Sequence, residues 1–206
     1  MINISMCIIA KNEAHCIADC INSIQPFVNE VLIVDDHSTD DTVAISRLMG
    51  ARVESLPFHV KDEGFAAAVN YMVKIASHDW VCWIDADELM PEIQQLHTLT
   101  RYPGKEVWAL PRRKWLQYPI IREEYEAYPD WQVRLFKRND QYQFEGHMHI
   151  KYNCPKVSYA YRGPHVEHRQ YECSTRNKNL QRDELYPKLA SIQGVTVIGG
   201  HPVKQQ

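Results

Sequence analysis

The stretch that decides the fold is Trp80-Val81-Cys82-Trp83-Ile84-Asp85-Ala86-Asp87-Glu88. Its first five residues are apolar, and a continuous apolar run is typical of a strand buried on both faces of a sheet. Acidic side chains at the carboxyl end of such a strand lie where open α/β sheets bind ligands. The carboxylates of Asp85 and Asp87 can share one divalent cation, and oxygen ligands suit Mg²⁺ or Mn²⁺. A polar turn after a strand would have a similar sequence, so the choice between a metal site and a turn depends on the surrounding residues.

The residues before this stretch alternate between strand and helix patterns. Apolar segments predict strands over Ile4–Ala10, Val31–Val34, Arg52–Leu56 and Trp80–Ile84. Three helices are predicted between them. The first has an apolar face at Ile17, Ile21 and Ile24 after an N-cap at Asn12, and the second begins at a capping box of Ser38 and Asp41 and ends at Gly50. The third has an apolar stripe at Phe65, Val69, Met72, Val73 and Ala76. This order predicts an α/β fold whose sheet is mostly parallel, with helices on both faces.

The second half of the chain is richer in aromatic residues, arginine and histidine. Its patterns predict strands over Val107–Trp115, Gln132–Lys137, Gln143–Lys151 and Lys156–Arg162, and a helix over Glu172–Leu189. No repeat or linker separates the halves, so we predict one domain over residues 1–206, with a smaller mixed or antiparallel portion after residue 100.

Composition narrows the class of protein. A length of 206 residues and a net charge of −3 indicate one domain and give no sign of a nucleic-acid partner. The six cysteines form no Cys-x-x-Cys pair, which indicates reduced thiols and an intracellular location. With no visible signal peptide or membrane-spanning stretch, we expect a cytoplasmic protein whose membrane contact, if it has any, is peripheral at the inner face.

Polar residues also follow the first two strands. Asp35 and Asp36 end the second strand, where carboxylates can accept hydrogen bonds from a base or a ribose. Asp40 and Asp41 are expected only to favour a helix N-terminus electrostatically. Ala10-Lys11-Asn12-Glu13 ends the first strand. Because the carboxyl ends of parallel strands meet at one edge, these groups should converge with Asp85 and Asp87 on one cleft.

Together these segments resemble the family 2 glycosyltransferases of GT-A fold, most closely the branch that includes lipopolysaccharide-core glucosyltransferases. The resemblance covers roughly residues 2–150 with order and spacing kept, although His37 stands where relatives more often have glycine. It is carried by Ala10 to Glu13, Val34 to Thr42, Asp62-Glu63-Gly64-Phe65 with Asn70, Ile84 to Glu88, Trp131 to Lys137 and Phe144 to His149. It implies a Rossmann-like fold, a nucleotide-sugar donor, a divalent cation and an inverting hexosyltransferase that acts in surface polysaccharide or lipopolysaccharide synthesis.

The resemblance also implies roles for particular residues. Residues 1–100 would form the nucleotide-binding half and residues 101–206 the acceptor-side half. Asp87 would bind the metal with His149, and Asp85 would contact it through water or bind the ribose. Arg134 fits a diphosphate contact and fits a structural ion pair equally well. The nucleotide-binding residues implied are Ala10, Asn12, Glu13, Asp35, Asp36, Asn70, Asp85, Ala86 and Arg134.

Histidines in the second half offer further metal ligands. In a strand over Gln143–Lys151, Glu145, His147 and His149 would share one face, opposite an apolar face. By resemblance His149 is preferred and His147 is second. His165 and His168 form another pair, for which a solvated loop is the preferred interpretation. The histidine spacing leaves zinc open as the metal, but no set of cysteines accompanies it.

An acceptor hydroxyl group has a high pKa and needs a positioned base at the moment of attack. Asp130 is the candidate, because it lies just before the Trp131 strand on what the resemblance gives as the acceptor side. Glu124 is a weaker alternative. The nearby Tyr125 and Tyr128 fit either core packing or stacking on a sugar. The sequence does not name the acceptor, which could be a glycan, a lipid-linked molecule or a protein.

Two other functions fit parts of the sequence. A nucleotidyltransferase that makes an activated sugar would need a glycine-rich phosphate loop near the N-terminus, and residues 1–20 contain no glycine. A non-catalytic module that binds a nucleotide or sugar would keep the fold, but the retained Asp85 and Asp87 argue against it. Donor turnover with and without Mn²⁺ separates the three functions.

Overall fold

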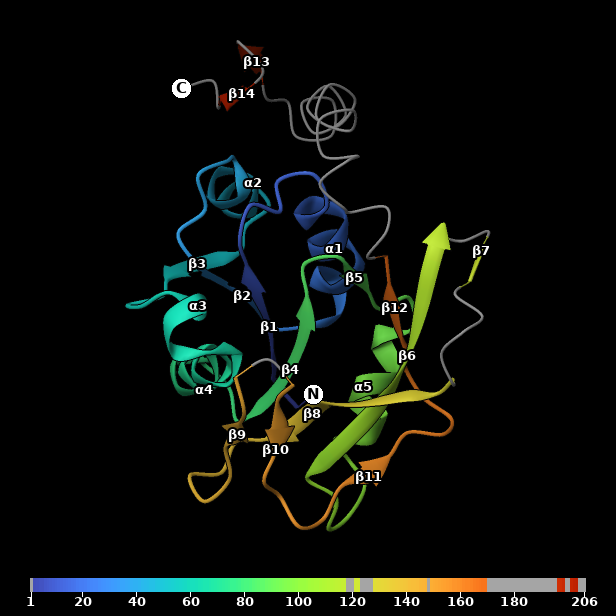
Figure 1. Cartoon of the computed structure of the whole chain (residues 1–206). Helices are drawn as coiled ribbons and strands as arrows, with labels where there is room; N and C mark the ends of the chain where they lie inside the picture. Colours follow the sequence, from blue (N-terminus) through green and yellow to red (C-terminus); the bar gives the residue numbers. More distant parts are fainter. Residues whose placement is uncertain are drawn as a thin grey trace.

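A computed structural model describes residues 2–117, 121–122, 128–147, 149–169, 196–198 and 201–203. Its main feature is a ten-stranded sheet in the order β3-β2-β1-β4-β8-β6-β12-β5, with β7 and β11 also paired to β6 (Figure 1). The strands are β1 (Ile4–Ala10), β2 (Glu30–Asp35), β3 (Arg52–Ser55), β4 (Trp80–Asp85), β5 (Glu88–Leu89), β6 (Val107–Gln117), β7 (Ile121–Arg122), β8 (Asp130–Lys137), β9 (Phe144–Glu145), β10 (Lys151–Tyr152), β11 (Ser158–Tyr159), β12 (Val166–His168), β13 (Thr196–Ile198) and β14 (His201–Val203). The helices are α1 (Ile17–Ile24), α2 (Thr42–Leu48), α3 (Val60–Glu63), α4 (Phe65–Ile75) and α5 (Leu96–Leu99), with short 3-10 helices η1 (Gln25–Phe27) and η2 (Ile93–Gln95).

Strands β3, β2, β1 and β4 are all parallel, as the alternating sequence predicted. In the register of this half, Ala10 pairs with Asp35 and Ile9 pairs with Asp85. The ends of three strands therefore lie side by side at one edge of the sheet. This edge brings together the polar segments that follow β1, β2 and β4.

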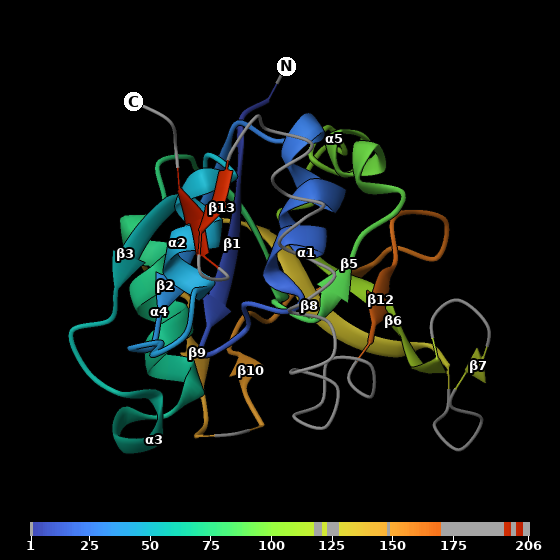
Figure 2. The same cartoon turned by 90° about the horizontal axis from the view of Figure 1, so that it is seen from above.

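The apolar core lies on both faces of the parallel half. Along β1, Ile4, Met6 and Ile8 pack in one cluster with residues of α1 and α2, whereas Cys7 packs in a second cluster with residues of α4. Figure 2 shows α1 and α4 on opposite sides of β1. The continuous apolar sequence of these strands follows from this, because neither face meets water. The expected α/β class with helices on both faces is confirmed. Within the described ranges, no helix combines the length and apolar composition needed to cross a membrane.

Two helices begin later than predicted. Cys16 rather than Asn12 precedes α1, and Asp41 rather than Ser38 precedes α2. The side chains of the two predicted caps bond between the loops instead: Asn12 Oδ1 accepts from the backbone N–H of Thr39 at 2.8 Å, and Ser38 Oγ accepts from the backbone N–H of Asn12 at 2.9 Å. These polar side chains join two loops and do not cap helices.

The rest of the sheet is mixed, as predicted for the smaller portion. Strand β8 is antiparallel to both β4 and β6, whereas β12 is parallel to β6 and antiparallel to β5. Of the predicted strand Lys156–Arg162, the structure forms only the part that is β11. The predicted helix Glu172–Leu189 lies outside the described residues.

The single strand predicted over Gln143–Lys151 is wrong. The structure has two short antiparallel strands there, β9 and β10. Gly146 between them has φ of 106°, and a Cβ atom at this glycine would lie 2.7 Å from the carbonyl oxygen of His149. The chain turns at Gly146, so Glu145, His147 and His149 do not alternate along one strand.

Candidate functional site

Hydrogen bonds join the loops after β1 and β2 at the carboxyl edge of the sheet. The backbone N–H of Thr39 donates to Asn12 Oδ1 at 2.8 Å, and that of Glu13 donates to Thr42 Oγ1 at 2.7 Å. Asn12 has φ of 56°, a left-handed conformation in which asparagine is enriched. Asn12 thus holds this loop in shape, and its contact with a nucleotide stays a prediction, as does that of Glu13.

Two buried carboxylates follow β2. Asp35 is 3% exposed; the backbone N–H of Ser38 donates to its Oδ2 at 3.1 Å, and its buried Oδ1 has no hydrogen-bond partner in the described part of the chain. Asp36 accepts hydrogen bonds from Lys11 Nζ at 2.9 Å and from the backbone N–H of Val60 at 3.3 Å. Burial raises the pKa of Asp36, but the Lys11 and Val60 hydrogen bonds outweigh it and hold the pKa below its usual value. Asp36 is therefore an ionised acceptor at the sheet edge.

A buried ion-pair network holds the end of β4. Glu88 is completely buried and accepts hydrogen bonds from the backbone N–H of Asp85 at 2.9 Å and from Arg134 Nη2 at 2.8 Å. Burial raises the pKa of Glu88 to about 7, although Arg134 opposes this. Arg134 Nη2 also lies 3.2 Å from Asp85 Oδ2, and its guanidinium lies 4.0 Å from the ring centroid of Trp83. With 1% of its surface exposed, Arg134 fits the structural ion pair rather than a diphosphate contact.

Asp87 lies beside His168, a histidine that the sequence analysis assigned to a solvated loop. His168 lies in β12, opposite Glu88 of β5, and is 9% exposed. Its Nε2 is 3.2 Å from Asp87 Oδ2. Burial raises the pKa of Asp87, but the hydrogen bond and charge of His168 outweigh it and hold the pKa below its usual value. The solvated-loop interpretation is therefore wrong for His168, which lies in a strand. A strand of three residues is too short to be recognised from its sequence pattern.

His149 occupies a different place from Asp87. It is exposed in the turn between β9 and β10, and within the described ranges it makes no hydrogen bond or ion pair with Asp85 or Asp87. The carbonyl oxygen of His147 accepts a hydrogen bond from the backbone N–H of Phe65 at 2.7 Å, which ties this turn to α4. The structure thus brings His168, rather than His149, to Asp87.

Three other predicted nucleotide-binding residues are buried or hydrogen-bonded within the protein. Asn70 Nδ2 donates to the carbonyl oxygen of Phe144 and its Oδ1 accepts from the N–H of Phe144, both at 2.8 Å. This pair of bonds fixes β9 against α4. Ala10 and Ala86 are 2% and 4% exposed, so almost none of their surface can meet a ligand.

The predicted base, Asp130, sits in the mixed half. Its Oδ2 accepts from Arg112 Nε at 2.8 Å and from Arg112 Nη2 at 2.6 Å, and its Oδ1 accepts from Gln132 at 2.8 Å. Burial raises the pKa of Asp130, but the Gln132 and Arg112 hydrogen bonds outweigh it and hold the pKa below its usual value. The alternative base Glu124 lies outside the described residues, as does Tyr125.

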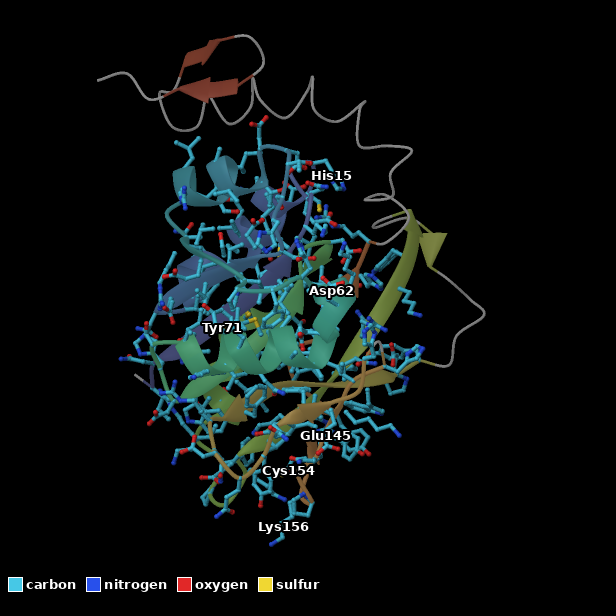
Figure 3. The ribbon with its side chains drawn as sticks, turned by 60° about the vertical axis from the view of Figure 1, so that its left-hand side comes forward. His15, Asp62, Tyr71, Glu145, Cys154 and Lys156 are labelled. Atoms are coloured by element: carbon cyan, nitrogen blue, oxygen red, sulfur yellow. The ribbon has the colours of Figure 1, made fainter. Side chains whose placement is uncertain are left out.

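A cavity of about 500 Å³ lies away from the edge of the sheet where β1, β2 and β4 end. Its lining includes Lys105, Lys137, Cys154 and Lys156. Figure 3 shows Cys154 and Lys156 at the end of the molecule opposite to His15, which follows β1. This cavity is therefore separate from the candidate site.

Comparisons with known proteins agree with the sequence resemblance. A family model described as Glycosyl transferase family 2 matches residues 5–155. An uncharacterized glycosyltransferase of Rickettsia felis is 44% identical over 115 residues, which cover 52% of this chain and 39% of that protein. The SPbeta prophage-derived glycosyltransferase SunS of Bacillus subtilis is 31% identical over 144 residues, covering 69% of this chain and 33% of SunS.

Among solved structures, glucosyl-3-phosphoglycerate synthase from Mycobacterium tuberculosis in complex with Mn²⁺, uridine diphosphate and glucosyl-3-phosphoglycerate aligns with a TM-score of 0.45. The sequence identity is 28%, and the alignment covers 54% of this chain and 44% of that one. The chain spans less than half the length of the relatives it matches.

Proposed function

Because the chain belongs to glycosyl transferase family 2, we propose that it moves a sugar from a nucleotide-sugar donor to an acceptor hydroxyl group, with inversion at the anomeric carbon. The observation that carries the proposal is the shared edge of the sheet. There the ionised Asp36 follows β2 and the Asp87–His168 pair follows β4, on either side of β1. Asp35 and Asp36 would accept hydrogen bonds from the nucleoside, and the Asp87 end of the edge would face the diphosphate.

Asp87, Asp85 and His168 would hold the divalent cation in this proposal. Asp87 Oδ2 and His168 Nε2 lie 3.2 Å apart, so both atoms could serve the same ion. Carboxylate oxygens with one imidazole suit Mn²⁺ or Mg²⁺. A cation bound there would act as a Lewis acid and would stabilise the negative charge that develops on the departing diphosphate. Glu88 and Arg134 hold the end of β4 so that Asp85 keeps its position.

We keep Asp130 as the proposed base for the acceptor hydroxyl group. Arg112 holds its carboxylate in the ionised form, which can accept a proton, and Oδ1 has only Gln132 as a hydrogen-bond donor within the described part of the chain. A carboxylate oxygen has two lone pairs, so Oδ1 retains one for the acceptor. Synthesis of surface polysaccharide or lipopolysaccharide at the inner face of the membrane is the setting that we propose for this reaction.

The decisive experiment is a mass-spectrometric screen of nucleotide sugars for donor hydrolysis and transfer, run with Mn²⁺ and with EDTA. We expect turnover of one donor that EDTA abolishes. Asp87→Ala should lower the rate about 100-fold or more, because a charged ligand of a partly desolvated cation is lost. Asp140→Ala, an exposed acid in the turn after β8, is the matched control and should leave the rate unchanged.

Adding nucleoside triphosphates with sugar phosphates to the screen separates the rival functions. A nucleotidyltransferase would release pyrophosphate from a nucleoside triphosphate and a sugar phosphate. A binding module would retain a nucleotide sugar without turning it over. Equal donor affinity and equal turnover in EDTA would contradict the proposed role of Asp87.

A further inference from the structure

A second group of metal-ligating side chains lies at the other end of the sheet edge. Asp36, His37 and His59 each offer one ligand atom, and these atoms all lie within 4.8 Å of one another. Two imidazole nitrogens with one carboxylate oxygen suit zinc and its transition-metal neighbours better than Mg²⁺, which prefers oxygen alone. We propose that Asp36, His37 and His59 form a Zn²⁺-binding site distinct from the proposed cation site at Asp87.

The fold already holds the three side chains together. Asp36 and His37 follow β2, whereas His59 directly precedes α3. His59 Nδ1 lies 3.3 Å from Asp36 Oδ1, and the rings of His37 and His59 have centroids 4.2 Å apart. Lys11 Nζ binds the other carboxylate oxygen of Asp36 at 2.9 Å. Little rearrangement is needed to close these ligands around one ion.

His37 is oriented as a metal-binding histidine usually is. Its Nε2 lies 3.3 Å from the carbonyl oxygen of Phe58, which can accept the ring N–H. A histidine that donates one ring N–H to a backbone carbonyl presents its other nitrogen as the ligand atom, and such outer partners commonly orient metal-bound imidazoles. His37 also has φ of 56°. Sparsely populated backbone conformations of this kind persist where the surroundings over-determine them, often at ligand-binding positions.

The site would leave room for further ligands. His37 is exposed and His59 is half-buried, so water can complete a tetrahedral coordination shell. A bound ion would also occupy the Asp36 carboxylate, so zinc-loaded protein should bind donor nucleotide poorly. This last consequence rests on the proposed function, whereas zinc binding itself does not.

Binding of Zn²⁺ and Co²⁺ to the full chain tests the proposal without any measurement of activity. Titrations in excess Mg²⁺, which competes for the oxygen ligands of the proposed Asp87 site, are compared for the wild type, His37→Ala, His59→Ala and the control His78→Ala. His78 is half-buried just before β4, at the opposite edge of the sheet. We expect each of the two site variants to bind Zn²⁺ at least about 100-fold more weakly, since changing even an outer-sphere partner costs 10- to 100-fold, and His78→Ala to bind as the wild type does.

Visible absorption of the Co²⁺ form gives a second measurement. Nitrogen and oxygen ligands give d–d bands without the thiolate charge-transfer band that the separate group of Glu13, His15 and Cys16 would add. Circular dichroism checks that the variants are folded. Wild-type zinc affinity in both His37→Ala and His59→Ala, or a thiolate band in the Co²⁺ spectrum of the tight site, would overturn the proposal.

Discussion

The parallel half and the mixed half of the sheet place their polar groups in opposite ways. In β1, β2 and β4 the buried side chains are mostly apolar, and charges such as Asp35 and Asp36 come where the strands end. In the mixed half, charges are buried within the strands, such as Glu88 in β5, Arg134 in β8 and Glu167 in β12. One half therefore offers a polar edge to a ligand, while the other uses buried charge pairs to shape the site.

The largest expected effect is on the stability of the mixed half. Arg134→Ala removes the closer of the two guanidinium groups at the buried Glu88, the other being that of Arg112 at 3.6 Å. Removing one partner of a buried ion pair costs about 3–5 kcal/mol, and we expect the lower end of this range because Arg112 remains and the raised pKa of Glu88 favours its protonation. Lys137→Ala, in the same strand, removes a cation whose exposed pair with Glu106 spans 3.5 Å, and such surface pairs contribute about 0–1 kcal/mol. Urea unfolding followed by tryptophan fluorescence measures both. Equal costs for the two variants would contradict the claim that buried charge pairs stabilise the mixed half.

The next effect concerns the chemistry that we assign to the mixed half. Asp130→Asn keeps the shape of the side chain but removes the proton acceptor, so transfer should fall about 100-fold, while donor binding stays near normal. Steady-state transfer at saturating acceptor, with Asp140→Asn as the control, measures this. Transfer at the wild-type rate would show that Asp130 serves only its ion pair with Arg112, and Glu124 would be the next residue to test.

The smallest effect belongs to the edge of the parallel half. Asp36→Ala should raise the donor KM about tenfold and change kcat little, because a hydrogen bond to the nucleoside is similar in the ground state and the transition state. Donor titrations of Asp36→Ala and Asp140→Ala give the two constants. An unchanged KM with a collapsed kcat would show that Asp36 takes part in the chemical step. The parallel half would then not be limited to binding the nucleotide.

The difference between the halves also explains what the sequence could predict. The strands of the parallel half were found because the apolar run in each is continuous. The position of Asp35 and Asp85 at the same edge, on either side of β1, follows from parallel pairing. His168 was named as a candidate, but its strand and its partner were not predicted, because Val166–His168 is too short for a periodic pattern and Asp87 is 81 residues away. The pattern of Gln143–Lys151 looked like one strand because a positive φ at Gly146 leaves no trace in hydrophobic alternation.

The pairing of Asp87 with His168 has a consequence for how the chain folds. Asp87 and His168 are 81 residues apart, and the parallel half already contains a pairing of similar separation, that of Ile4 with Trp80. Loop-closure entropy grows only slowly with length, so the two closures cost nearly the same. The contact of Asp87 with His168 depends on the pairing of β12 with β5. Binding of the proposed cation would therefore report that the two halves of the sheet have assembled.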